Sequence, residues 1–534
     1  MRLFAYSVQL TKVLEQTADV NLTQFAPNAG GPSEQMNRFV FFLVLWIAGV
    51  GWFEQAIAQS AIQNPSARSV VSLDGEWSYI IDPYSTGDTT ILGTPKEDGY
   101  FLDLQAAGSG DLLEYDFEKA PRLNVPGSWT TQNKSIEFYE GIVWHRTRFE
   151  ASVKAGRRYF LQFEAVNYRA DVFVNGQLLG SHEGGFTPFA FEVTDNLREG
   201  DNSLVVKVEA ERRADRVPGI RMDWWNYGGI TRSVRLIETP QSFVRQYEVG
   251  LADAGPNQID VTVELDGAVA QSVEIAIPEL SLEQSVIVEA NGVASLSLEA
   301  ECITLWSPEN PKLYRVEITT GDETLIDDIG FRTIETVGRR TLVNGRPIYL
   351  MGISIHDERL GDDGGRIASK EQASALLDKV EAMEANFIRL AHYPHNEYML
   401  READRRGLLV WSELPVYWGI DWNNPETLKS AKQQYAEMIA RDVNRASIAV
   451  WSVANETINS PERLTFLSAL ATHVRDLDDS RLLAAALLPD YSDAAVQKMV
   501  STAMSIMAGK PAEEYHIVVD DPLGEYIDLV ALNQ

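Results

Sequence analysis

The chain has 534 residues, a length that favours several domains over a single hydrophobic core. Its formal net charge of −31 argues against nucleic acid as a partner, because a surface of that sign repels phosphates. The one cysteine, Cys302, excludes an intrachain disulfide framework and a cysteine metal site. We expect it to be a small buried apolar side chain.

An apolar run from Phe39 to Phe53 follows Arg38 and precedes the small-x-small sequence Ala56-Ile57-Ala58. A positive start, about 15 apolar residues and a small-residue site make a secretory signal peptide, which we place at residues 36–58. A membrane helix usually needs about 20 apolar residues, so we expect no stable membrane span after cleavage, with an uncleaved anchor as the alternative. We expect translation to start at Met36, residues 1–35 to be an extension, and the rest to be exported to the periplasm or outside the cell.

Residues 67–240 contain short alternating apolar runs, such as Tyr159–Phe163, Asp171–Val174 and Ser203–Val208, separated by Gly, Asn and Asp. Asn175-Gly176 between two such runs is the strongest short signal of a β-hairpin. No helical period competes with this pattern. We predict an antiparallel β-sandwich of the jelly-roll type over residues 67–240.

Short strands continue through residues 241–334, which we predict to be an immunoglobulin-like β-sandwich. The predicted strands are Gln258–Leu265, Ser272–Ile277, Val286–Val288, Ala294–Leu298 and Tyr314–Thr319.

After the turn at Asn344-Gly345, continuous apolar strands alternate with helical periods. The predicted strands are Ile348–Ser354, Phe387–Ala391, Leu408–Leu414, Ile448–Ala454, Leu482–Leu488 and Ile527–Leu532. A helix between the first two strands is predicted from the spacing of Ala373, Leu376, Leu377, Val380 and Met383. Asn424-Pro425 and Ser460-Pro461 each place a capping residue before a first-turn proline. Residues 335–534 therefore predict about six of the eight units of a (β/α)8 TIM barrel, so the fold class is multidomain β plus α/β.

Polar residues stand at or just after the ends of these buried strands. Because functional residues of such barrels gather at the carboxyl ends of the strands, we expect these side chains to meet at one rim. Such a rim suits a small polyhydroxylated ligand. The residues are His356, Arg389, His392, Glu413, Asn455, Glu456 and Asn533.

Asn455-Glu456 closes the apolar run Ile448–Ala454. A carboxylic acid in such surroundings favours its neutral form, which suits a general acid that protonates a glycosidic oxygen. An adjacent Asn can hold the 2-hydroxyl of the sugar, an interaction that strengthens in the transition state.

These motifs give the chain a specific resemblance to glycoside hydrolase family 2 over about residues 67–534. Residues 441–456, 386–394 and 407–415 resemble the barrel motifs of the family, and Gly330-Phe331-Arg332 with Asn344-Gly345 resembles its entry into the barrel. The other matching motifs are LWSPENPKLY at 305–314, GIVWHRTRF at 141–149 and DWWNYGGITR at 223–232.

The resemblance implies roles for individual residues. Glu456 matches the proton donor and Asn455 its 2-hydroxyl partner, while Asp223 matches a loop residue that the first domain lends to the site. Glu413 matches a buried strand-end carboxylate, for which a structural ion pair with an Arg and a substrate contact both stay open. The residues that match the lining of the sugar pocket are His356, Arg389 and His392, with a satisfied core histidine as the alternative for the two His.

Two stretches depart from the family pattern: Arg445-Ala446 stands where the family has His-Pro, and the loop after the first strand reads HDERLGDDGG. His392 and His395 have no third ligand patterned nearby, so we expect no metal, and the implied mechanism needs no cofactor. Oligomers are common among the proteins that the chain resembles, so the resemblance implies a homo-oligomer as one expectation.

The resemblance also implies a carboxylate nucleophile at the end of the seventh barrel strand. Gln534 follows the sixth predicted strand, so we expect no nucleophile within this chain. Three interpretations stay open: a fragment or frameshifted copy of a retaining exo-β-glycosidase of carbohydrate catabolism, a non-catalytic carbohydrate-binding protein, and a pseudoenzyme. The motifs at 141–149 and 223–232 favour a β-glucuronidase-like substrate preference over a β-galactosidase-like one.

Overall fold

A computed structural model describes residues 59–89, 108, 115–252, 255, 257–267, 272–359, 364–488, 501, 504, 507 and 521–532. The predicted signal peptide, the extension before it and Asn533 lie outside these residues. Across the described part of the chain, no helix combines the length and the apolar character needed to cross a membrane.

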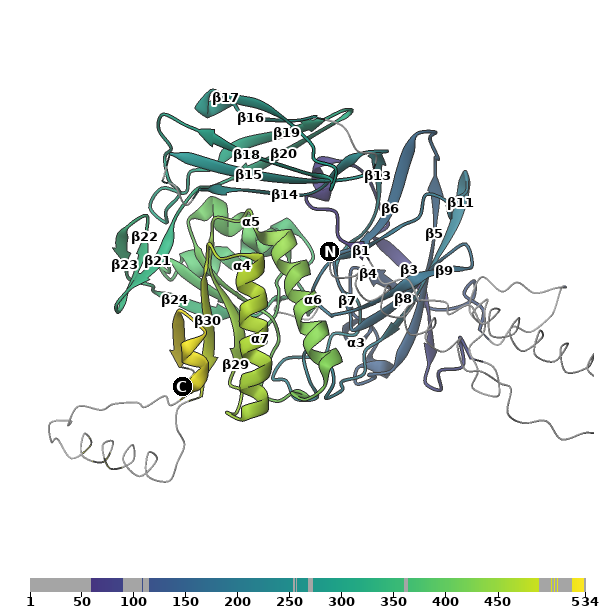
Figure 1. The fold of residues 1–534 in the computed structure, drawn as a ribbon. Coiled ribbons are helices and arrows are strands. Elements are labelled where there is room, and N and C mark those ends of the chain that lie inside the picture. The colour runs from purple at the N-terminus through teal and green to yellow at the C-terminus, as the bar shows by residue number, and fades with distance from the viewer. Residues whose placement is uncertain are drawn as a thin grey trace, which may run out of the picture. The chain divides into compact units, whose positions relative to one another are not determined.

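The first domain is a sandwich of two antiparallel sheets (Figure 1). One sheet has the order β1 (Gln59–Ser60), β10 (Phe189–Glu192), β6 (Arg157–Phe163), β13 (Val234–Pro240) and β2 (Ser69–Ser72). The other has the order β4 (Arg122–Val125), β3 (Gly75–Asp82), β5 (Ile142–Ala151), β11 (Gly200–Glu209), β8 (Arg169–Val174) and β9 (Gln177–Glu183). The remaining elements are the pair β7 (Val166–Asn167) and β12 (Gly229–Ile230), the short helix α3 (Trp129–Gln132), and 3-10 turns at Pro65–Ala67 and Lys134–Ile136.

The predicted hairpin joins β8 to β9. Asn175 and Gly176 both have positive φ, 50° and 86°, which is the backbone conformation that a two-residue turn between twisted strands requires. Apolar side chains of both sheets, among them Trp77, Phe163 and Val206, form one core between the layers. The turn chemistry and the alternation together thus produce the predicted jelly roll.

The second domain packs two further antiparallel sheets over its own core. One sheet contains β14 (Phe243–Leu251), β15 (Gln258–Asp266) and β18 (Val293–Glu299). The other contains β17 (Leu282–Ile287), β16 (Ser272–Ile277), β19 (Tyr314–Thr320) and β20 (Glu323–Ile329), with a 3-10 turn at Pro278–Leu280.

Two expectations for this domain need correction. The strand predicted at Val286–Val288 runs from Leu282 to Ile287, because it pairs along the whole of β16. Cys302 is exposed rather than buried. It lies in the irregular segment after β18, where strand alternation no longer determines which side chains face the core.

The third domain is a sheet of six parallel strands that follow one another in chain order. The strands are β24 (Gly352–Ile355), β27 (Phe387–Leu390), β28 (Leu409–Glu413), β29 (Ile448–Asn455), β30 (Leu482–Leu487) and β31 (Leu529–Leu532). The helices are α4 (Lys370–Glu381), α5 (Glu397–Arg406), α6 (Pro425–Asp442) and α7 (Pro461–Leu477), with a 3-10 turn at Pro522–Glu525. Antiparallel strands β21 (Ile334–Val337), β22 (Arg340–Val343) and β23 (Arg346–Ile348) precede the sheet, and β25 (Glu358–Arg359) pairs with β26 (Gly365–Arg366). The predicted fold class is confirmed.

Helix capping follows the predicted pattern. The Asn424 side chain accepts a hydrogen bond from the Glu426 amide at the start of α6, and the Ser460 side chain accepts one from Arg463 at the start of α7. Met383, in contrast, is 63% exposed and lies beyond the end of α4. Glu384 with φ 56° turns the chain away from the helical path at that point.

The first barrel strand begins at Gly352 and not at Ile348. Residues Arg346–Ile348 pair with β22 in an antiparallel hairpin, so the apolar run divides between two sheets. A Cβ at Gly352 would lie 2.0 Å from the Phe387 carbonyl oxygen, so the close start of the β24–β27 pair depends on glycine.

A buried charge network joins the second domain to the barrel. Arg445 is 3% exposed, and its guanidinium contacts Asp327 at 2.5 Å and Asp404 at 3.3 Å. Asp327 also accepts a hydrogen bond from the Tyr247 hydroxyl at 2.7 Å. Because Arg445 stands just before β29, this network fixes the start of the strand that ends in Asn455. The departure from the family pattern at Arg445 therefore serves packing between domains.

We predict that Arg445→Met lowers the free energy of unfolding by about 3–5 kcal/mol, because Asp404 loses its ion pair and Asp327 keeps one of its two cations, Arg401 at 2.7 Å. Denaturant titration followed by circular dichroism measures the change. Arg405→Met is the control. Arg405 is 59% exposed and pairs with Glu402, so this substitution should lower the free energy of unfolding by less than about 1 kcal/mol. Equal losses in the two variants would contradict the structural role of Arg445.

Candidate active site

The carboxyl ends of three neighbouring strands bring most of the predicted site residues together. β27 pairs with β28 in the register Arg389 to Trp411, and β28 pairs with β29 in the register Glu413 to Ser452. Arg389 is the last residue but one of β27, while Glu413 and Asn455 end β28 and β29, so these polar side chains reach the same edge of the sheet.

Arg389 is the centre of this edge. Its guanidinium donates to the Glu413 carboxylate at 2.9 Å and to Asn455 Oδ1 at 2.5 Å. Nδ1 of His392 lies 2.9 Å from Glu413 Oε1, and the Trp411 indole donates to Glu413 Oε2 at 2.8 Å. Glu413, which is 1% exposed, is therefore in the structural ion pair that the sequence left as one of two alternatives.

The charge state of Glu413 follows from these contacts. Burial alone would raise the pKa of its carboxyl, but the Arg389 guanidinium and the hydrogen bond with His392 hold the pKa below its ordinary value. An ionised Glu413 fixes Arg389, which in turn orients the Asn455 amide oxygen. The pair thus positions the residue that precedes Glu456.

Glu456 lies directly after β29 with φ 50°, a backbone conformation that is uncommon for a residue with a side chain. Its amide donates to the Ala486 carbonyl at 2.8 Å, which ties this turn to β30. Its carboxylate accepts a hydrogen bond of 2.7 Å from the indole of Trp418, itself at φ 51°. Glu456 and Trp418 also line a pocket of about 690 Å³ that includes Ile220 and Trp422.

Aromatic side chains form the wall beside this carboxylate. Trp224, from the first domain, lies edge-on to Tyr417 and Tyr393 with ring centroids 5.2 and 5.3 Å away. The same indole is 5.9 Å from the His392 ring and 6.5 Å from the His356 ring. Both histidines are half-buried against Trp224, rather than enclosed in the core.

Asp223 reaches the same wall. The Tyr417 hydroxyl hydrogen-bonds to its carboxylate, and burial together with this carboxylate raises the pKa of Tyr417. His356 Nδ1 lies 3.2 Å from the Tyr393 hydroxyl. Burial and then the neighbouring His392 lower the pKa of His356, so His356 is neutral at neutral pH. The structure therefore brings the predicted site residues that it describes to one rim, with Asp223 from the first domain, while Asn533 lies outside the described residues.

A buried ion pair attaches the first domain to this rim. Arg232 donates to Asp357, the residue after His356, at 2.9 Å, with the two side chains 1% and 0% exposed. It also donates to the Pro394 carbonyl at 2.7 Å, next to the segment that carries His392. The motif at 223–232 thus supplies Asp223 and Trp224 at one end and this anchor at the other.

Sequence reasoning missed the aromatic wall and this anchor. Trp224 and Arg232 lie inside the motif at 223–232, from which the family resemblance predicts only Asp223 as a site residue. The sequence signal for the other aromatic residues is their position within a few residues of predicted strand ends. These residues are Tyr393, Tyr417 and Trp418. In the part of the chain that the structure describes, no group of three His, Cys, Asp or Glu side chains could hold a metal ion.

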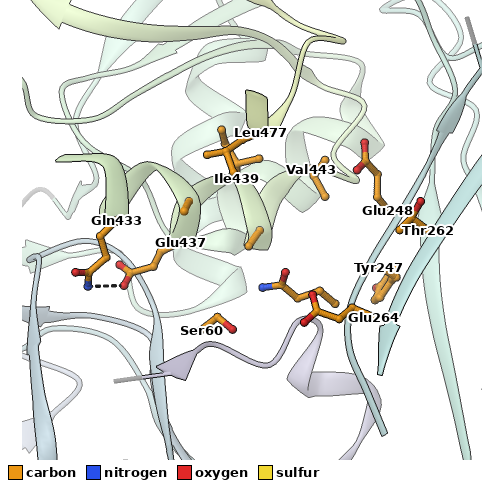
Figure 2. Close-up of a pocket in the computed structure, with 13 residues that line it drawn as sticks. Ser60, Tyr247, Glu248, Thr262, Glu264, Gln433, Glu437, Ile439, Val443 and Leu477 are labelled. Atoms are coloured by element: carbon orange, nitrogen blue, oxygen red, sulfur yellow. Dashed lines mark hydrogen bonds between the residues drawn. The ribbon is translucent and has the colours of Figure 1, made fainter. Parts of the chain in front are cut away.

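A second pocket, of about 480 Å³, lies between α6 and the strands β14 and β15 (Figure 2). It contains none of the predicted site residues. Its charged side chains are Glu248, Glu264 and Glu437, and Glu437 is already bonded to His182 at 3.0 Å. This pocket is therefore not the candidate active site.

Three domain models of one family match consecutive parts of the chain. The family 2 glycosyl hydrolase sugar-binding domain matches residues 70–240, the central family 2 domain matches residues 246–332, and the family 2 TIM-barrel domain matches residues 334–515. The three models follow one another in the order of a multidomain glycoside hydrolase. The chain belongs to glycoside hydrolase family 2.

Curated relatives agree with this assignment. A beta-glucuronidase of Paenibacillus borealis is 28% identical over 78% of this chain and 72% of its own length. A beta-galactosidase of Thermoanaerobacter pseudethanolicus is 27% identical over 78% of this chain. A solved structure of b-glucuronidase from Ruminococcus gnavus in complex with D-glucuronic acid is similar to this chain with a TM-score of 0.69 and 25% sequence identity. The match covers 90% of this chain and 78% of the Ruminococcus chain. The chain spans about half the length of other relatives: 55% of the Thermoanaerobacter protein and 46% of one from Formosa agariphila.

Buried His395, beside the site, makes the stability of the fold sensitive to acid. Burial lowers the pKa of His395 to about 4, whereas an unfolded histidine titrates near pH 6.5. Below that pH the unfolded chain binds a proton that the folded chain does not, so stability falls as the pH falls towards 4. Between pH 7 and pH 5, we predict that the free energy of unfolding falls by about 2 kcal/mol less in His395→Gln than in the parent. Denaturant titrations at the two pH values measure this difference.

The half-exposed His473 provides the control for this prediction. His473→Gln should keep the acid sensitivity of the parent. If His395→Gln and His473→Gln respond to pH in the same way, the buried ring is not the source.

Proposed function

We propose that this chain acts in the hydrolysis of β-glycosides, with Glu456 as the proton donor. The observation that carries the proposal is the position of Glu456. It follows directly after Asn455, on a rim where Arg389 and His392 come from the barrel and Asp223 and Trp224 come from the first domain. A carboxyl group beside an amide, histidines and an aromatic face is what protonation of a glycosidic oxygen over a bound sugar requires.

We place the sugar against Asn455, His392 and Trp224, with Asn455 against its 2-hydroxyl. The pocket that Glu456 lines with Ile220, Trp418 and Trp422 would hold an apolar leaving group. Glu413 is fixed by Arg389 and His392, so we assign the nucleophile of the retaining mechanism to none of the described residues.

The substrate class follows from the relatives, which carry the names beta-glucuronidase and beta-galactosidase. We propose a β-glucuronide as the first choice and a β-galactoside as the second. The second candidate function is carbohydrate binding without hydrolysis. It is favoured by the aromatic wall around Trp224, which needs no second carboxylate to hold a sugar.

Turnover of 4-nitrophenyl β-D-glucuronide by the retaining mechanism requires a second carboxylate that none of the described residues supplies. Where the chain releases nitrophenol, we predict that Glu456→Gln lowers kcat/KM by about 10²–10⁴-fold. The loss should be smaller with a 2,4-dinitrophenyl leaving group, because that group departs without protonation. The matched control is Glu462→Gln, an exposed glutamate in the first turn of α7, which should keep the parent rate.

The outcomes separate the candidates. Equal rates for Glu456→Gln and Glu462→Gln would show that another group supplies the proton. If the chain releases no phenol from a β-glucuronide or a β-galactoside, the hydrolysis proposal is wrong for this chain. Protection against thermal unfolding by D-glucuronate, absent in Trp224→Ala, would then support binding alone.

We also propose that the chain is exported, on the basis of the apolar run at Phe39–Phe53 and the small residues that follow it. Expression of the whole chain in a bacterium should give a secreted protein whose first residue lies near Gln59. N-terminal sequencing of that product tests the proposal. Retention of residues 1–35 in the mature protein would contradict it.

A further inference from the structure

A separate pocket of about 330 Å³ lies between the first domain and the β25–β26 hairpin. The first domain contributes Ser128, Thr131, Tyr227 and Thr231, and the hairpin contributes a pair of arginines, Arg359 and Arg366. The volume is within the range of small-ligand sites. None of the residues that carry the proposed function lines this pocket.

Arg366 is the deepest cation of the pocket, with 5% of its surface exposed. None of its three guanidinium nitrogens forms a hydrogen bond of normal geometry with a described residue, although the Tyr393 hydroxyl lies near enough to interact with it. The guanidinium is instead surrounded by rings, with its central carbon 4.3 Å from the Tyr393 centroid, 4.6 Å from Phe186 and 5.1 Å from Tyr227. Aromatic faces attract a cation, but they accept few of the five N–H bonds that a guanidinium offers.

Two further groups in the pocket share this lack of partners. Nε of Arg359 and Oγ1 of Thr231 are buried without a hydrogen bond to any described residue. Nη2 of Arg359 lies 3.1 Å from the position that a Cβ at Gly365 would occupy, and the Thr131 hydroxyl lies 3.9 Å from that position. Glycine at 365 therefore leaves room for the Arg359 guanidinium beside the threonine hydroxyl.

Glu358 faces Arg366 across the hairpin but forms no ion pair with it among the described residues, and its carboxyl lies against the Tyr227 hydroxyl. The charged side chains among the described lining residues of the pocket are the two arginines themselves. Buried charges in folded proteins are normally paired, and a planar fork of N–H groups matches the oxygens of a carboxylate or a sulfate.

We propose that this pocket is a binding site for an oxyanion, a carboxylate or a sulfate group, held by Arg366 and Arg359 with hydroxyls of Thr131 and Thr231. The group can come from an acidic sugar residue or from a free inorganic anion. The site is distinct from the rim of Glu456, since Tyr393 separates them: one face of the ring packs on Arg366, and its hydroxyl reaches His356.

The test is calorimetric titration of the whole chain with sodium sulfate, sodium D-glucuronate and methyl β-D-glucoside at constant ionic strength. We expect saturable, Arg366-dependent binding of an anion, at least tenfold weaker in Arg366→Met. Arg359→Gln, at the half-exposed mouth, should weaken binding by a smaller factor and carries less risk to folding. The matched control is Arg216→Met: Arg216 is also 5% exposed and lies 4.9 Å from the Tyr168 ring, but it is ion-paired with Glu209.

Each outcome decides the proposal. Sulfate and glucuronate binding that weakens in both pocket variants but not in Arg216→Met supports the site and assigns it to oxyanions in general. The same pattern with glucuronate alone assigns it to an acidic sugar. Sulfate binding that is unchanged in Arg366→Met and Arg359→Gln, or Arg366-dependent binding of the neutral glucoside, overturns it. Glucuronate is also expected at the rim of Glu456, so its titration is repeated in Trp224→Ala, where binding that neither arginine substitution weakens overturns the proposal as well. Glu456→Gln should leave sulfate binding unchanged, so failure of the hydrolysis proposal would be seen separately.

Discussion

The ion pair between Arg389 and Glu413 is the interaction on which the rim depends. Its two members end neighbouring strands, and each is held by several bonds, so neither side chain can turn without leaving a buried charge unpaired. Asn455 and His392 take their orientation from this pair. The proposed acid therefore stands next to a fixed arrangement rather than on a free loop.

The first domain is part of this arrangement and not an appendage. Trp224 and Asp223 face the histidines and Tyr417, while Arg232 forms a buried ion pair with Asp357. A rim built from two domains owes its shape to their junction. This explains why the motif at 223–232, remote in sequence from the barrel, belongs to the same site as Glu456.

The sequence predicted the elements well wherever periodicity and turn chemistry agree, as at Asn175-Gly176 and at the proline-capped helices α6 and α7. It placed the polar strand ends correctly because parallel strands bring their carboxyl ends to one edge. It failed at Ile348, where one apolar run serves two sheets, and at Cys302, where an irregular segment follows a strand. Trp224 and Arg232 could not be assigned from the sequence, since their partners lie more than a hundred residues away.

The separation of Arg232 from Asp357, 125 residues along the chain, has a consequence for biosynthesis. The first domain leaves the ribosome well before its partner carboxylate has been made. During that interval Arg232 can stay hydrated, so the half-made protein exposes a cation that the finished protein buries. Arrival of the His356-Asp357 segment then removes this charge from water. When the barrel docks, it covers a surface of the first domain that stays hydrated until then.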